Sequence, residues 1–295
     1  MDSYIANPVT NHDDAVDRVN ASIAADPLSV RDNCHTILMT HGRKTDRVLI
    51  CMHGLTNCPI QFHQFGQRFF DLGYNILIPR MPHHGYLDRM THEPSKLTVD
   101  DLKQWTDEAV ATAQGLGDKV VITGISIGAV AVLWAAQTRK DVYLAAPICP
   151  AIAPKGTNLK TAKLLGRMLR AAPNGMIWWD PRIREKLTPE YVYPRFSTRA
   201  LAVSFLLGAQ VVELSRRSKP AAQHIKVIVS LRDPSVNNNI SAQLVANWRE
   251  HGADADFNAL DWGKVHDVID PDQPYAQVDK IYPLLIDLIH EPQPS

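Results

Sequence analysis

The sequence lacks the features that mark several classes of protein. Lysine and arginine together number 31, as do aspartate and glutamate, so no basic excess points to nucleic-acid binding. No polybasic run suits an anionic membrane surface, and the first 20 residues lack the charged and apolar regions of a secretory signal. No uninterrupted apolar run reaches the roughly 18 residues of a membrane-spanning helix. We therefore expect a cytoplasmic protein without stable membrane insertion or nucleic-acid partner.

Cysteine is scarce, with Cys34, Cys51, Cys58 and Cys149 in 295 residues. None forms a CxxC pair, and Cys51 and Cys149 lie in apolar, strand-like runs. We therefore expect buried free thiols in a reducing compartment. Apolar residues make up 45% and charged residues 21%, as in globular proteins. A chain of this length buries a large core without disulfide or metal staples.

Short β-branched runs alternate with longer amphipathic stretches from about residue 47. Five runs show the nearly continuous hydrophobicity of parallel strands covered on both faces, namely Arg47–Met52, Tyr74–Ile78, Lys119–Thr123, Val142–Ala146 and Ile225–Ser230. Thr98 and Asp101 predict the start of one helix, and Gly115 and Gly117 predict its end. Ile127–Gln137 is apolar almost all round, which is typical of a buried helix. This alternation predicts an α/β fold with a mostly parallel, doubly wound sheet.

Two segments depart from this alternation. Residues 1–46 contain a candidate antiparallel edge pair, in which CHTILMT leads through a turn into RVLICM. Residues 150–221 hold seven prolines between short helix-like pieces and show no regular strand signal. An insertion of about 70 residues is too long for a simple connection between two strands. We therefore predict a helical cap or lid at 150–221, inserted into a core made of 1–149 and 222–295.

A G-x-S-x-G motif follows one predicted strand directly and leads into the apolar helix. It reads Gly124-Ile125-Ser126-Ile127-Gly128. A sharp strand-to-helix turn holds the serine in strained backbone geometry and leaves its Oγ exposed at the helix N-terminus. There the helix dipole and the Ile127 N–H can stabilise developing negative charge. The motif predicts that Ser126 is a nucleophile.

A nucleophilic serine needs a base, usually a histidine held by a carboxylate. When the serine lies on such a turn, the three follow the chain order serine, acid, histidine. Asp233 comes just after the strand that ends at Ser230, where active-site groups of open sheets gather. Among 12 histidines, His266 alone fits both order and context. Asp256, Asp261 and Asp267 lie nearby, but we expect Asp233 to orient His266.

The strand Arg47–Met52 ends in His53-Gly54-Leu55-Thr56. A glycine at this turn lets the chain pass close to the serine. The N–H of Leu55 is then expected to point at the forming oxyanion, together with that of Ile127. We expect His53 to be a structural turn residue.

The run HGLTNCPIQFHQFGQRFFDLGYNILIPRMPHHGY resembles α/β-hydrolase carboxylesterases and monoacylglycerol lipases. Members carry an HG oxyanion turn, a following helix, a GY lead-in to a strand and a proline-rich GHG turn. The resemblance extends to GISIGA, to Asp233 with Val236, and to His266, so it covers roughly residues 47–149 and 222–289. His83 replaces the first glycine of GHG, Leu55 stands where phenylalanine or glycine is common, and the cap matches poorly. The resemblance implies the α/β-hydrolase fold and hydrolysis of carboxylic esters through an acyl-enzyme.

Substrate and alternatives follow from this resemblance and from the apolar cap. Met176, Trp178, Trp179 and Phe205 are candidates for a pocket that accepts hydrophobic acyl or aromatic esters. An acyltransferase or thioesterase that uses the same acyl-enzyme is the alternative, and a non-catalytic binding module is a third reading. We expect no organic cofactor and no metal, because His83, His84, Asp88 and His92 match no zinc spacing. The expected partner is a small-molecule ester. The oligomeric state stays open, with a homodimer as one option.

Overall fold

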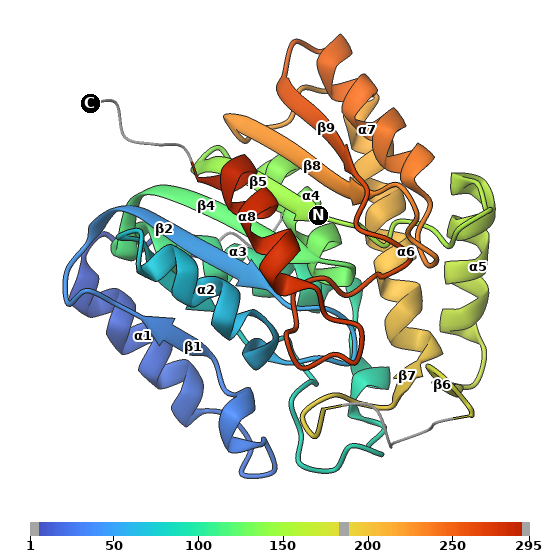
Figure 1. Cartoon of the computed structure of the whole chain (residues 1–295), viewed down its shortest axis with the longest axis horizontal. Coiled ribbons are helices and arrows are strands. Elements are labelled where there is room, and N and C mark those ends of the chain that lie inside the picture. Colours follow the sequence, from blue (N-terminus) through green and yellow to red (C-terminus); the bar gives the residue numbers. More distant parts are fainter. Residues whose placement is uncertain (1–5, 183–188, 291–295) are drawn as a thin grey trace.

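The chain folds around a seven-stranded sheet, seen in a computed structural model that describes residues 6–182 and 189–290 (Figure 1). The strands are β1 (Ile37–Met39), β2 (Thr45–Met52), β3 (Asn75–Ile78), β4 (Gly117–Ile125), β5 (Val142–Ile148), β8 (His224–Ser230) and β9 (Asp254–Leu260). Their order across the sheet is β1-β3-β2-β4-β5-β8-β9. Within this described sheet β1 runs antiparallel to its neighbour, and every other neighbouring pair is parallel.

Helices cover both faces of the sheet. The first face carries α1 (His12–Ala24), α3 (Val99–Leu116), α4 (Ile127–Thr138), α6 (Thr198–Ser215) and α7 (Asn238–Glu250). The second carries α2 (His63–Phe70) and α8 (Val278–Ile289). Within β2, Val48, Ile50 and Met52 belong to the apolar core of the first face, whereas Leu49 and Cys51 belong to that of the second. Successive side chains of a strand point to opposite faces, so β2 is buried on both sides. This confirms the predicted doubly wound sheet.

The local helix signals are also confirmed. Asp101 N donates to Thr98 Oγ1 at 3.1 Å, and Thr98 N donates to Asp101 Oδ2 at 2.8 Å, which is a complete capping box at the start of α3. The helix ends at Leu116, and Gly117 opens β4 in extended conformation. A Cβ on Gly117 would lie 2.5 Å from Val48 N, so the close passage of β2 and β4 requires glycine there.

Two details of the sheet differ from expectation. The predicted antiparallel pairing of β1 with β2 is wrong: β1 pairs with β3, and Ile37 lies opposite Ile78. The reason is that both edges of β2 are already taken by β3 and β4. The sequence also gave no indication of β9, whose exposed positions carry Asp254 and Asp256. Charged side chains are typical of a strand at the sheet edge, which is only partly buried and therefore less hydrophobic.

The described part of the inserted segment 150–221 contains two α-helices, α5 (Leu159–Ala171) and later α6. It also contains a small antiparallel sheet of β6 (Met176–Trp178) and β7 (Arg195–Ser197), for which the sequence shows no regular strand signal. Strands of three residues are too short to leave a periodic pattern. The boundary between cap and core stays a prediction.

Helix α6 lies within the inserted segment but also packs against the helices of the central sheet. Within the described ranges it is one helix that is long and apolar enough to cross a membrane. However, Ala200, Val203, Leu207 and Val211 of α6 share one apolar core with α4. The packing of α6 therefore accounts for its hydrophobicity, because a helix that is apolar nearly all round is typical of a protein core.

The expectation of free thiols is wrong for two of the four cysteines. Cys34 and Cys58 form a disulfide with a Cα–Cα distance of 5.3 Å, whereas Cys51 and Cys149 are free and buried. The bond ties a short 3-10 turn, Asp32–Cys34, to the residue that precedes a second one, Pro59–Phe62. The spacing of 24 residues in the sequence carries no motif that announces the pairing.

Reduction of this disulfide is expected to lower the free energy of unfolding by about 3 kcal/mol, the loop-closure value for a ring of this size. Urea unfolding of the oxidised and the reduced protein measures the difference. The double variant Cys34→Ser/Cys58→Ser should resemble the reduced protein and should not respond to reductant. Four titratable thiols in the unfolded, unreduced protein would show that the bond does not form.

Candidate active site

Ser126 lies on the sharp turn between β4 and α4 that the motif predicts. Its backbone has φ 60° and ψ −116°, a left-handed conformation that non-glycine residues rarely adopt. A Cβ on Gly128 would lie 2.1 Å from Met52 O, and one on Gly124 would lie 2.8 Å from Met52 Cβ. The two motif glycines are therefore required because the turn presses against the end of β2. The turn leaves the Ser126 side chain partly exposed.

The predicted acid and base meet in the structure. His266 Nδ1 lies 2.7 Å from Asp233 Oδ2, and Asp233 is only 1% exposed. The other carboxylate oxygen, Oδ1, accepts hydrogen bonds from the backbone N–H groups of Ser235 at 2.7 Å and Val236 at 3.3 Å. Because an ionised carboxylate only accepts hydrogen bonds, His266 carries its proton on Nδ1. Its Nε2 is then free to take a proton.

Burial shifts the pKa of each member of this pair in one direction, and attraction to the partner shifts it in the other. Burial raises the pKa of Asp233, but the hydrogen bond and charge of His266 lower it more, so that the carboxyl titrates below its ordinary value. Burial lowers the pKa of His266, but the hydrogen bond and charge of Asp233 raise it above the ordinary value. The dyad therefore favours an ionised carboxylate and stabilises an imidazolium when one forms.

The competing carboxylates have other partners. Asp261 Oδ1 accepts from Arg232 at 2.7 Å, and Asp256 Oδ1 accepts from Arg249 at 2.8 Å. Within the described residues, Ser126 Oγ makes no hydrogen bond to His266. In structures without a bound substrate, a contact of this kind is often long and tightens when substrate binds.

The predicted oxyanion turn follows β2. In the parts of the chain that the structure describes, neither the Leu55 N–H nor the Ile127 N–H donates a hydrogen bond to a protein group. His53 is fully buried; its Nδ1 donates to Gly54 O, and its Nε2 accepts from Met81 N, each at 3.0 Å. Burial and the nearby His84 lower the pKa of His53 to about 3, so its ring is neutral. These contacts agree with a structural role for His53.

The inserted segment 150–221 contacts this turn directly. Trp179 Nε1 donates to Thr56 Oγ1 at 3.0 Å, and Tyr193 N donates to Thr56 O at 2.8 Å. Of the predicted pocket residues, Phe205 is buried, Met176 and Trp178 are partly exposed, and Trp179 is exposed. Their role in substrate binding stays a prediction.

Two features of the site have no signal in the sequence. The Sγ of Cys149, a carboxylate oxygen of Asp233 and a ring nitrogen of His266 all lie within 4.8 Å of one another. Gln61 bridges the oxyanion turn and the residue after His266, Asp267. Each contact joins segments that are remote in sequence, so only the folded chain reveals them.

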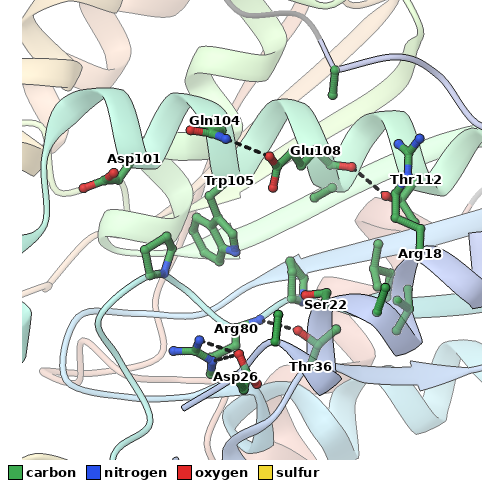
Figure 2. A pocket seen from close by; sticks show the side chains of 18 of the residues that line it. Arg18, Ser22, Asp26, Thr36, Arg80, Asp101, Gln104, Trp105, Glu108 and Thr112 are labelled. Atoms are coloured by element: carbon green, nitrogen blue, oxygen red, sulfur yellow. Dashed lines mark hydrogen bonds and ion pairs between the residues drawn. The ribbon is translucent and has the colours of Figure 1, made fainter.

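A cavity of about 820 Å³ lies elsewhere, between α1, α3 and the end of β3 (Figure 2). Figure 2 shows Trp105 of α3 above the ion pair of Arg80 with Asp26, with Ser22 of α1 beside them. Neither Ser126 nor His266 lines this cavity. It is therefore separate from the candidate active site.

The fold and the turn at Ser126 agree with a comparison of sequences. A family model described as the alpha/beta hydrolase family matches residues 48–281. The chain belongs to this family. No curated protein matches the hydrolase in sequence.

Solved structures resemble the hydrolase over most of its length. One belongs to work on LipS and LipT, two metagenome-derived lipolytic enzymes, with 20% identity, a TM-score of 0.64, and coverage of 88% of this chain and 98% of that one. A monoacylglycerol lipase from Paleococcus ferrophilus has 16% identity, a TM-score of 0.64 and coverage of 86% and 97%. A soluble variant of monoglyceride lipase from Saccharomyces cerevisiae has 14% identity and a TM-score of 0.58, with coverage of 87% of this chain and 92% of that one. At these identities the likeness shows the common fold, which confirms the expected α/β-hydrolase fold.

Proposed function

We propose that this hydrolase is a serine esterase that cleaves carboxylic esters, with Ser126 as nucleophile, His266 as base and Asp233 as the orienting acid. The hydrogen bond of 2.7 Å between His266 and Asp233 is the observation that carries the proposal. It leaves the Nε2 of His266 available, and Ser126 stands on a strained turn that exposes its hydroxyl.

The chemistry follows from these groups. Ser126 Oγ attacks the ester carbonyl while His266 Nε2 takes the hydroxyl proton, and the tetrahedral oxyanion accepts hydrogen bonds from the N–H groups of Leu55 and Ile127. Collapse breaks the bond to the alcohol, which leaves with the proton held on His266. Water then attacks the acyl-enzyme with His266 again as base, releasing the carboxylic acid and regenerating Ser126.

The preferred substrate in this proposal is an ester with a hydrophobic acyl or aromatic group. It is supported by the apolar character of the cap around β6, where the rings of Trp179 and Phe196 pack in a tilted arrangement with centroids 4.5 Å apart. The partner in this proposal is a small-molecule ester. Three further points remain proposals from the sequence: that residues 150–221 form a cap, that the protein has no nucleic-acid partner, and that it forms a homodimer.

A panel of p-nitrophenyl esters from acetate to palmitate tests the proposal. We expect hydrolysis of several of them, with kcat/KM rising from acetate to longer chains because an apolar pocket gains about 0.8 kcal/mol for each buried CH₂. The same reactions with added alcohols and thiols, and with acyl thioesters, separate an esterase from an acyltransferase or a thioesterase. Absence of hydrolysis across the panel, together with product formation only from added acceptors or thioesters, would contradict the esterase assignment.

The cellular compartment of the hydrolase can also be tested by experiment. The sequence predicts the cytoplasm, and the Cys34–Cys58 disulfide weighs against it because disulfides persist mainly in oxidising compartments. Fractionation of cells, with alkylation of free thiols before lysis, would distinguish a cytoplasmic location from an oxidising compartment.

A further inference from the structure

Gln61 lies between the two loops that supply the oxyanion turn and the base. It sits in the turn Pro59–Phe62 and is 2% exposed. Its Oε1 accepts from Gly54 N at 2.8 Å, and its Nε2 donates to Asp267 Oδ2 at 2.8 Å. Gly54 directly precedes Leu55, and Asp267 directly follows His266. One amide side chain therefore joins the backbone of the oxyanion turn to a side-chain carboxylate of the histidine loop.

The orientation of this amide follows from its partners. An N–H group can only donate, and a carboxylate oxygen can only accept, so a flipped Gln61 would place donor against donor and acceptor against acceptor. Asp267 is itself fixed, because its Oδ1 accepts from the backbone N–H groups of Ile269 and Asp270, each at 3.2 Å. The bridge thus runs from a rigid part of the histidine loop to the oxyanion turn.

The peptide unit between Gly54 and Leu55 is held through its carbonyl oxygen. A planar trans peptide points its N–H opposite to its C=O, so whatever orients Gly54 O also orients the Leu55 N–H. His53 Nδ1 donates to Gly54 O at 3.0 Å, and Asn57 N donates to it at 3.2 Å. Glycine has no Cβ to restrict its dihedral angles. Gln61 restrains the preceding peptide unit by accepting from the N–H of Gly54, so that the units on both sides of the Gly54 Cα are held.

We infer that Gln61 is a positioning residue that keeps the Leu55 N–H aimed at the oxyanion and in register with His266. This inference rests on the proposed function for its catalytic consequence. The cap reaches the same network, since Tyr191 OH donates to Asp270 Oδ1 at 2.7 Å and Asn57 Nδ2 donates to Asp270 Oδ2 at 3.1 Å. The network therefore connects the cap, the oxyanion turn and the histidine loop through buried groups.

The effect on turnover is expected in kcat. Loss of an oxyanion donor costs about 10²- to 10³-fold, and Gln61→Ala keeps the donor but loosens its aim, so we expect kcat to fall about 10- to 100-fold. KM should stay within about twofold, because the bond to the oxyanion forms in the transition state and not with bound ester. Gln114→Ala is the matched control, since Gln114 Nε2 donates to Asp141 Oδ2 at 2.6 Å on the other side of the sheet.

An exchanged pair separates positioning from packing. Gln61→Glu alone sets a carboxylate against Asp267, and Asp267→Asn alone sets an amide against Gln61, so each should lower kcat about 10-fold or more. The double variant Gln61→Glu/Asp267→Asn exchanges amide and carboxylate at equal size and restores both hydrogen bonds. Its kcat should return to within about threefold of the wild type.

A measurement without turnover tests the inference independently of the proposed function. Hydrogen exchange of the amides of residues 53–58 should become about 10-fold faster in Gln61→Ala, because the Gly54 N–H loses its acceptor, and should stay unchanged in Gln114→Ala. Unchanged exchange overturns the inference whether or not the protein is an esterase. In an active esterase, a kcat of Gln61→Ala within twofold of the wild type, or failure of the double variant to recover, also overturns it. An inactive wild type with the expected exchange contradicts the proposed function alone.

Discussion

The Ser126→Ala variant is expected to lose ester hydrolysis by on the order of 10⁶-fold, the loss seen when a catalytic serine is removed from a triad. The hydroxyl supplies the atom that forms the acyl-enzyme, and no other nucleophile stands on the turn after β4. The free energy of unfolding should change by less than about 1 kcal/mol, because the side chain is partly exposed and only one oxygen is removed.

Two measurements check this result together. Turnover of a p-nitrophenyl ester gives the loss of rate, and labelling by a fluorophosphonate followed by mass spectrometry locates the reactive residue. The control Ser218→Ala changes an exposed serine in the turn after α6 and should keep full activity and labelling. A labelled Ser126→Ala protein, or one with more than a hundredth of the wild-type rate, would exclude Ser126 as the nucleophile.

The features that can be predicted from the sequence are those that depend on short stretches of neighbouring residues. The continuous apolar runs of β2 and β4 reflect burial on both faces of one sheet, so they are legible without knowledge of their partners. The glycines around Ser126 are demanded by a single close approach to Met52. Asp233 is predictable because it follows a recognisable strand end, and His266 because it alone among the histidines fits both the chain order and the context.

The parts that sequence reasoning missed depend on contacts between remote segments. Gln61 and Asp267 are 206 residues apart, and neither lies in a motif. Asp267 is adjacent to His266 in the sequence, but its carboxylate bonds to Gln61 and to backbone N–H groups. The disulfide, like the pairing of β1 with β3, depends on which segments meet in space. Which segments meet depends on the packing of the whole chain, and no local sequence pattern predicts it.

The Asp233→Asn variant is expected to lower kcat about 10⁴-fold and to move the acid limb of the pH profile downward. An amide in place of the carboxylate can hold the histidine in the wrong tautomer and no longer stabilises the imidazolium, which accounts for the loss in kcat. The carboxylate and hydrogen bond of Asp233 raise the pKa of His266, whereas burial lowers it. Without the carboxylate the lowering by burial remains, so the pKa of His266 must fall.

The direction of the pH shift follows from the form of His266 that acts as base. Only the neutral imidazole takes the proton of Ser126, and a lower pKa keeps it neutral to lower pH, so the acid limb of kcat/KM moves down. Profiles from about pH 4 to about pH 9 for the wild type and the variant measure this shift. Asp261→Asn is the matched control, because Asp261 pairs with Arg232 at 2.7 Å and not with a histidine. If Asp233→Asn keeps its acid limb, or loses less than tenfold in kcat, then the contact at His266 Nδ1 has no part in catalysis and the base must be sought elsewhere.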